Sequence, residues 1–146
     1  WTVNCSVLLP LRILIAIMFR WQAVRLGFSI PPNVFGPGLA IVHYGPIVVN
    51  GNSHVGENCR VHTCVNIGGD GRLVDAELAR RLVPWIGNNV YIGPGAKIYG
   101  AVQIADGIAI GANAVASCDK VGVTLAGIPA KVVSNNGSRG MIVGHD

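Results

Sequence analysis

Isoleucine recurs at every sixth position in the second half of the chain, at residues 86, 92, 98, 104 and 110. A second apolar series follows four residues after each isoleucine: Val90, Ala96, Val102, Ile108 and Ala114. An α-helix repeats its apolar face every 3.6 residues and a half-buried strand every two, so neither element explains a period of six. Three short strands that turn through a triangular coil do explain it. The pattern predicts an all-β solenoid in which the first residue of each hexad points inward.

The same frame continues toward the N-terminus. It includes Val55, Val61 and Ile67 and, if the frame slips by two residues at Ser53 and His54, also Phe35, Ile41 and Ile47. With Ala116 this makes twelve hexads, which is enough for about four triangular coils. Inward residues of successive coils are expected to stack at the roughly 4.8 Å spacing of neighbouring strands. The fold class predicted is therefore a parallel β-helix with a short N-terminal α-helix.

Two segments leave the frame and set the domain boundaries. We expect residues 1–28 to form an N-terminal helical segment, residues 29–133 the β-helix domain, and residues 134–146 a C-terminal tail. The β-helix domain contains a loop insertion at residues 69–85. Asp75 precedes the run AELARRL and is expected to cap a short helix there.

The N-terminal segment contains the apolar stretch VLLPLRILIAIMFRW, which is too short and too interrupted to predict a membrane span. We expect an amphipathic helix packed on its own protein or on a neighbouring subunit. Peripheral membrane contact through Arg12, Arg20 and Arg25 is the alternative. Since the first residue is Trp, we expect the sequence to be part of a longer chain or to be renumbered.

Composition excludes several classes of protein. Of 146 residues, 51% are hydrophobic and only 12% charged, which excludes a disordered chain. The net charge of +4 is not concentrated in a basic run, so nucleic acid is not an expected partner. The four cysteines show no CxxC spacing, which indicates a reducing compartment and favours a cytoplasmic location. The 20 glycines are expected at sharp corners that need a positive φ.

His43 is the candidate for chemistry, because it occupies an outward corner position and an imidazole can accept a proton near neutral pH. The alternative is a histidine at the surface or in a subunit contact. The expected register stacks Thr63 over His43, within about 5 Å at the backbone. His62 is assigned to a polar outer ladder rather than to catalysis. Neither Cys59 nor Cys64 has an evident activating partner for nucleophilic catalysis.

Three segments together resemble the serine acetyltransferase branch of the hexapeptide-repeat acyltransferases: GPGLAIVHYGPIVVNGNSHVGENCRVHTCVNIGG, IGNNVYIGPGAKIYGAVQIADGIAIGANAVA and AGIPAKVV. The resemblance covers about residues 28–133. It implies a left-handed coil, a homotrimer with active sites between subunits, and transfer of an acetyl group from acetyl-CoA to a hydroxyl. No metal is expected.

By position, the resemblance implies that His43 is the general base. It implies that Gly69, Pro94 and Ala112 lie along the pantetheine arm of CoA. Lys131 matches a basic position near the CoA phosphates, with a solvated surface charge as the alternative. We expect Tyr44 and Thr63 to contact the acceptor. Backbone N–H groups near Gly68 and Gly69 are candidates to stabilise the oxyanion, and Thr63, Glu57 or a backbone carbonyl to orient His43.

Departures from the family pattern bear on the acceptor. Val42 and Ser29 stand where the family has acidic residues, and Val83 where it has a second histidine. Without carboxylates to pair with an ammonium, a free amino acid fits poorly, so we expect a sugar or polysaccharide precursor as acceptor. The alternative is serine, with Asp75 or Glu77 of the loop replacing the missing acids.

Two other classes of function remain. A carbonic anhydrase-like zinc lyase would need about three histidine ligands, but His43, His54 and His62 fall on different corners. A non-enzymatic structural coil or binding module is the second.

Overall fold

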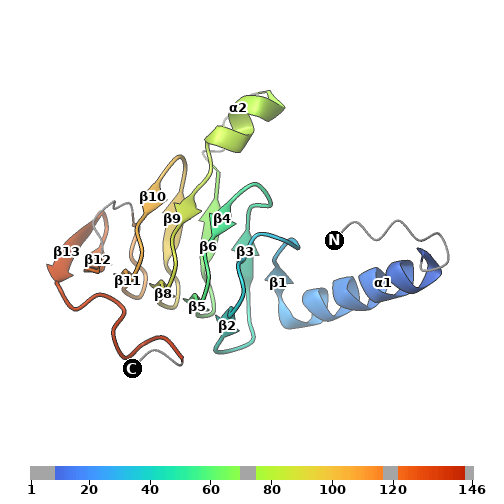
Figure 1. Cartoon of the computed structure of the whole chain (residues 1–146), viewed down its shortest axis with the longest axis horizontal. Helices are drawn as coiled ribbons and strands as arrows, with labels where there is room; N and C mark the ends of the chain where they lie inside the picture. The colour runs from blue at the N-terminus through green and yellow to red at the C-terminus, as the bar shows by residue number, and fades with distance from the viewer. Residues whose placement is uncertain (1–8, 70–74, 117–121, 144–146) are drawn as a thin grey trace.

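The computed structural model describes residues 9–69, 75–116 and 122–143. Residues 1–8, 70–74, 117–121 and 144–146 lie outside these ranges. They include Cys118 and His145, and parts of the predicted N-terminal segment, loop insertion and tail. Most of the described residues wind into a coil with three faces, each a sheet of short and mostly parallel strands (Figure 1).

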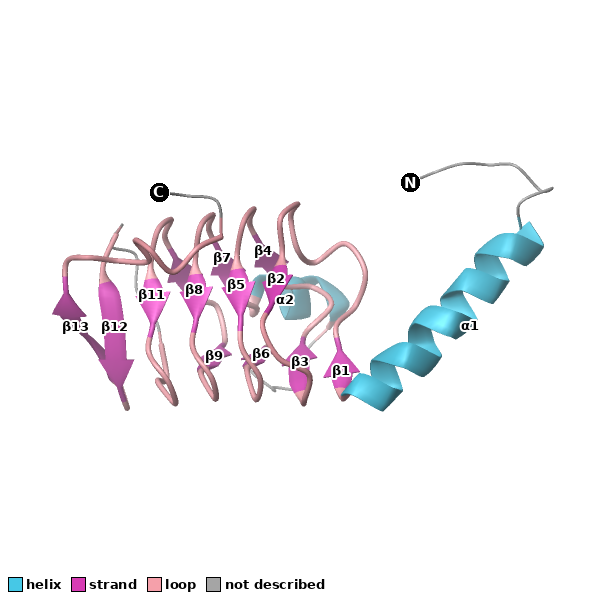
Figure 2. Ribbon diagram, turned by 90° about the horizontal axis from the view of Figure 1, so that it is seen from below, coloured by secondary structure: helices cyan, strands magenta, loops and turns pink. Residues whose placement is uncertain are grey.

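The first face joins β1 (Phe28–Ser29), β3 (Ile47–Val49), β6 (Asn66–Gly68) and β9 (Lys97–Tyr99). The second joins β4 (His54–Val55), β7 (Trp85–Ile86) and β10 (Gln103–Ile104). The third face has the order β2 (Ala40–Ile41), β5 (Arg60–Val61), β8 (Tyr91–Ile92), β11 (Ala109–Ile110), β12 (Thr124–Gly127) and β13 (Ala130–Ser134), as Figure 2 shows. Each of these strands pairs in parallel with its neighbour except β12 with β13, which are antiparallel.

The six-residue period builds the core. Val61, Ile92 and Ile110 are register partners on β5, β8 and β11, and all three side chains are fully or almost fully buried. Ile67 and Ile98 stack in the same way on the first face. β-branched side chains pack well on a pleated surface, and each contributes about 1.5–3 kcal/mol when fully buried. The predicted fold class, a parallel β-helix of about four coils, is confirmed.

The predicted place of the two-residue slip is wrong. Ile41 pairs with Val61, twenty positions later, whereas Val49 pairs with Ile67, eighteen positions later. The two additional residues therefore lie between Ile41 and Val49, not at Ser53 and His54. Ile47 is buried, but it pairs with Phe28 instead of occupying the hexad position expected for it.

Sharp corners use asparagine as well as glycine to reach positive φ. Asn58, Asn89 and Asn113 have φ values of 54°, 54° and 56°, and Gly95 has 75°. Asparagine tolerates the left-handed region better than most residues with a side chain. The expectation that corners require positive φ is confirmed, although glycine is not the only residue that supplies it.

Helix α1 (Leu9–Leu26) extends away from the β1 end of the coil (Figure 2). It ends at Gly27, which has φ 76° and donates its N–H to the carbonyl of Val24. None of its residues is buried, and large apolar side chains are exposed around it. The helix therefore does not pack on its own coil, and packing on a neighbouring subunit stays a prediction. The helix is not amphipathic, because Arg12, Arg20 and Arg25 point to different sides of a helix with 3.6 residues per turn. In the described ranges, no helix combines the length and apolar character that crossing a membrane requires.

Helix α2 (Ala76–Arg81) projects from the coil where the loop insertion rejoins it (Figure 1). The N–H of Leu78 donates to Asp75 Oδ1 at 2.9 Å, so the predicted cap is confirmed. Beyond β13, the chain folds back along the coil. Ser138 Oγ donates to the carbonyl of Asn89 at 2.6 Å, and Arg60 Nη1 donates to the carbonyl of Met141 at 2.9 Å.

Candidate active site

The two additional residues of the first coil produce an outward detour at the corner that follows β2. The detour begins after Val42, whose N–H donates to the carbonyl of Val61, and ends at Pro46, whose carbonyl accepts from the N–H of Cys64. Between these anchors the chain leaves the coil. His43 is exposed there, and the Tyr44 side chain is 82% exposed. The register thus presents an imidazole and a phenol to solvent at one corner.

Gly45 closes the detour and holds it against the next coil. Its φ is 131°, in a region that residues with a side chain rarely adopt. A Cβ at this position would overlap Thr63 Oγ1. The Thr63 hydroxyl therefore faces Gly45. The expected stacking of Thr63 over His43 at the backbone stays a prediction.

His43 contacts His62 instead. The two ring centroids lie 5.9 Å apart with an interplanar angle of 60°. His62 in turn meets the Tyr91 ring edge to face, with centroids 5.1 Å apart. Three rings from successive coils thus form a row at this corner. In the part of the chain that the structure describes, no hydrogen bond reaches the His43 ring.

The surroundings of His62 favour its neutral form. Burial lowers the pKa of His62, and the nearby Arg60 and His43 lower it further. Its Nε2 atom is buried and has no hydrogen-bond partner among the described residues. A neutral ring can lie against His43 without adding a second positive charge when His43 takes up a proton.

Below the detour, the same corner continues as a column of backbone hydrogen bonds. The N–H of Gly95 donates to the carbonyl of Thr63 at 3.0 Å, and the N–H of Asn113 donates to the carbonyl of Pro94 at 2.9 Å. Pro94 and Ala112 are exposed on this column. Lys97 Nζ donates to the carbonyl of Cys64 at 2.7 Å and secures the turn beside Thr63. The structure thus brings His43, Tyr44, Thr63, Pro94 and Ala112 to one corner.

Gly69 and Lys131 lie elsewhere in the chain. Gly69 follows β6, whereas Thr63 precedes it, so the two residues lie at opposite ends of that strand. Lys131 is on β13 and His43 follows β2, and these strands form the two edges of the six-stranded sheet. Five strand spacings, about 24 Å, separate those edges. One copy of the chain does not bring Gly69 or Lys131 to His43.

The positions that depart from the family pattern also lie around these elements. Val42 is half-buried immediately before the detour, and Ser29 is exposed on β1, where it pairs with Val48. Val83 lies against Gly69: its Cγ1 is 3.5 Å from the position that a Cβ on Gly69 would occupy. Glu57 sits at a different corner, where its N–H bonds Asn88 Oδ1. Glu57 therefore does not orient His43 of the same chain.

The other reactive side chains, Cys59 and His54, lie away from the His43 corner. Burial raises the pKa of the Cys59 thiol to about 11, and its Sγ donates to the carbonyl of Gly87. His54 stacks on Trp85 on the second face, so it does not join His43 and His62 in a ligand set. The described ranges contain no group of three metal-ligating side chains.

Sequence reasoning missed the ring contact between His43 and His62. The pair Gly45-Pro46 was the available signal for the place of the slip, because a glycine followed by a proline marks a turn. Either place of the slip leaves twenty positions between Ile41 and Val61, so counting positions sets His43 opposite Thr63 in both cases. The ring contact with His62 depends on how the side chains of the detour turn, which the register does not determine.

Comparison with known proteins agrees with this architecture. Residues 84–116 match the family model described as bacterial transferase hexapeptide (six repeats). A serine acetyltransferase of Helicobacter pylori is 33% identical over 112 residues, covering 75% of this chain and 63% of the relative. The serine acetyltransferase of Synechococcus elongatus is 33% identical over 115 residues, covering 77% of this chain and 45% of the relative. A crystal structure of serine acetyltransferase in complex with coenzyme A from Brucella abortus superposes with a TM-score of 0.63 at 32% identity. This chain is thus similar to serine acetyltransferases over about three quarters of its length, and it contains hexapeptide repeats.

The coil is left-handed, in agreement with the hexapeptide repeats and with the serine acetyltransferase structures that it resembles. The Brucella superposition covers 70% of this chain and 40% of that one. The hexapeptide-repeat chain thus spans about half the length of its curated relatives, between 45% and 63% for the two named above.

Proposed function

We propose that this chain transfers an acetyl group from acetyl-CoA to a hydroxyl, with His43 as the general base. The observation that carries the proposal is the exposed His43 imidazole on its detour, at the head of the column that presents Pro94 and Ala112. Similarity to serine acetyltransferases, one of them solved with coenzyme A, supports it. The exposed corner offers a backbone edge with small side chains, against which an extended arm such as pantetheine can lie.

In the proposed reaction, His43 removes the proton from the acceptor hydroxyl as its oxygen attacks the thioester carbonyl. The tetrahedral intermediate then collapses, the carbon–sulfur bond breaks, and the imidazolium returns its proton to the leaving thiolate. Acetyl passes directly to the acceptor, with no covalent enzyme. His43 ends the cycle neutral, so the step needs no further proton donor.

Serine is the acceptor that we propose to test first. The named relatives are serine acetyltransferases, and they favour the alternative of the sequence analysis over its first choice, a sugar. The apolar side chain of Val42 before the detour favours a neutral acceptor, since it offers no carboxylate for an ammonium group. A sugar hydroxyl therefore stays as the second candidate.

We also propose that the active site is shared between copies of the chain. The separation of Gly69 and Lys131 from His43 supports this, because a neighbouring copy can bring its own Gly69 or Lys131 to the His43 corner. The homotrimer implied by the resemblance is the assembly proposed. Helix α1 is proposed to make a peripheral membrane contact, because it exposes large apolar side chains and carries no acidic residue.

The test is a screen of acceptors in which release of CoA is followed with a thiol reagent. Serine and neutral sugars are offered at equal concentration, with hydrolysis in buffer alone as the control. Faster CoA release with either acceptor supports acetyl transfer, and the faster acceptor identifies the class. Release that no acceptor accelerates would contradict the proposal.

A further inference from the structure

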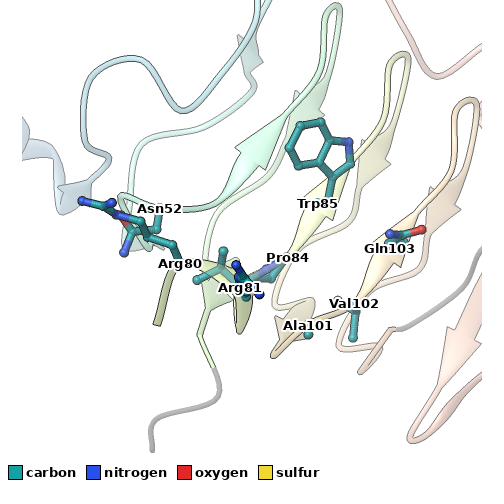
Figure 3. Close-up of a pocket in the computed structure, with 9 residues that line it drawn as sticks. Asn52, Arg80, Arg81, Pro84, Trp85, Ala101, Val102 and Gln103 are labelled. Carbon is teal, nitrogen blue, oxygen red and sulfur yellow. The ribbon is translucent and has the colours of Figure 1, made fainter. Parts of the chain in front are cut away.

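A cavity of about 350 Å³ lies at the foot of α2, away from the His43 corner. Its walls come from α2 and from three successive coils: Arg80, Arg81, Asn52, Trp85, Val102 and Gln103. In Figure 3, Asn52 and Arg80 stand on one side and Gln103 on the other, with Arg81 and Pro84 between them. The volume is at the lower end of the range typical of small-molecule sites.

Trp85 gives the cavity a fixed aromatic surface. His54, Trp85 and Gln103 are register partners on β4, β7 and β10, so their side chains form an outward row on the second face. The Trp85 ring stacks on His54 with centroids 4.0 Å apart and an interplanar angle of 23°. Even so, Trp85 is 59% exposed. One ring face is thus supported by the protein while much of the indole remains accessible to a ligand.

The two arginines give the cavity an excess of positive charge. Both pair with the single carboxylate of Glu77, Arg81 at 3.2 Å and Arg80 at 3.9 Å. Their side chains are 74% and 67% exposed, so these pairs are weak. None of the cavity-lining residues named for this site is acidic. One positive charge therefore remains without a partner in this group.

We propose that this cavity binds a phosphorylated ring compound, either a sugar phosphate or a nucleotide. A phosphate monoester carries close to two negative charges and three acceptor oxygens, which match two guanidinium groups. The ring of the ligand would lie against Trp85, and the amides of Asn52 and Gln103 would bond its hydroxyl or ring polar atoms. Arginine pairs phosphate bidentately, so the anion would displace the shared Glu77.

Within one chain this cavity is separate from the His43 corner, although Val83, which also lines the cavity, lies against Gly69. The cavity opens on the second face of the coil, whereas His43 stands at the corner between the third and first faces. Binding can therefore be measured without acetyl-CoA, and loss of one property leaves the other measurable.

The test is isothermal titration calorimetry of the purified chain with glucose 1-phosphate, adenosine 5′-monophosphate, glucose and inorganic phosphate. We expect at least one of the two phosphorylated ring compounds to bind about tenfold more tightly than glucose or inorganic phosphate. The compound that binds identifies the source, sugar or nucleotide. Equal binding of inorganic phosphate, or no binding of either ring compound, would overturn the proposal.

Variants locate the binding to this cavity. Arg81→Gln and Trp85→Ala should each weaken binding about tenfold, because each removes one of the two interactions. Trp85→Phe retains an aromatic surface and should restore most of the affinity if Trp85→Ala proves unstable. Arg139→Gln is the matched control, since it removes an exposed arginine that lies outside the cavity. Equal weakening by Arg139→Gln would show a general charge effect and contradict the assignment.

Discussion

The edge of the His43 ring meets the His62 ring, with centroids 5.9 Å apart and planes inclined at 60°. This contact joins the protruding detour to the rigid coil below it. His62 is itself in contact with Tyr91, so the orientation of His43 depends on half-buried rings of the coil rather than on the detour.

His62 is accordingly expected to act as a positioning residue for His43. His62→Leu removes the ring against which His43 rests, so kcat for acetyl transfer should fall about tenfold while KM for acetyl-CoA changes little. His62→Phe keeps an aromatic ring at this place and should retain most of kcat. Steady-state kinetics of the two variants check this. A similar kcat for wild type and His62→Leu would contradict a positioning role.

The lowered pKa of His62 predicts a pH dependence of stability. In the unfolded chain His62 titrates near 6.5, whereas burial, Arg60 and His43 lower its pKa in the folded protein. Between the folded pKa and 6.5 the unfolded state binds more protons, so the free energy of unfolding falls as the pH decreases through 6.5. Wild type should thus lose more thermal stability than His62→Leu between pH 8 and pH 5. Parallel losses in melts of the two proteins would show that His62 makes no such contribution.

Gly45 is expected to be intolerant of a side chain. Gly45→Ala combines a strained φ of 131° with overlap on Thr63 Oγ1, and should cost about 3 kcal/mol in the free energy of unfolding. Gly100→Ala is the matched control, because Gly100 has φ 77° but nothing near its missing Cβ, and should cost only about 1–2 kcal/mol.

Removing the hydroxyl of Thr63 separates the two effects at Gly45. In a Thr63→Ala background, Gly45→Ala should lose the overlap but keep the backbone strain, so its cost should approach that of Gly100→Ala. Denaturant unfolding of the wild type, the three single variants and the double variant measures these differences. If Gly45→Ala cost as much stability in the Thr63→Ala background as in the wild type, contact with Thr63 Oγ1 would not explain why residue 45 must be glycine.

The cysteines are expected to differ in reactivity. With a pKa of about 11, Cys59 is a thiolate in only about one molecule in a thousand at pH 8, whereas Cys64 is exposed. Iodoacetamide at pH 8 should modify Cys64 and spare Cys59 until denaturant is added, as peptide mass spectrometry can determine. Rapid modification of Cys59 in the folded chain would reopen its candidacy as a nucleophile.

The six-residue period predicted most of the fold because each inward position has one physical requirement, a buried β-branched or small side chain. Ile86, Ile92 and Ile98 meet it without interruption, and the structure buries all three. The cap at Asp75 was predictable for a similar reason, since it is a local hydrogen bond. Helix α1 was predicted as well, but the exposure of all its residues was not, because its sequence does not show what it packs against.

The candidate site was only partly predictable. The corner positions of Thr63, Pro94 and Ala112 follow from counting hexads, and the structure places them in one column. The contact of His43 with His62 does not, because the register sets His43 opposite Thr63 for either place of the slip. The ring contact depends on how the His43 side chain turns on the detour, and the hexad period does not determine this.

The most direct test of the account replaces the proposed general base. His43→Ala should lower the rate of acetyl transfer about a hundredfold or more, while the variant keeps the thermal stability and oligomeric state of the wild type. Arg139→Gln, an exposed substitution at the C-terminal end, should leave the rate unchanged. The measurement is CoA release with the best acceptor from the screen. A His43→Ala variant that assembles normally and transfers acetyl at a rate near that of the wild type would contradict the proposed function of this corner.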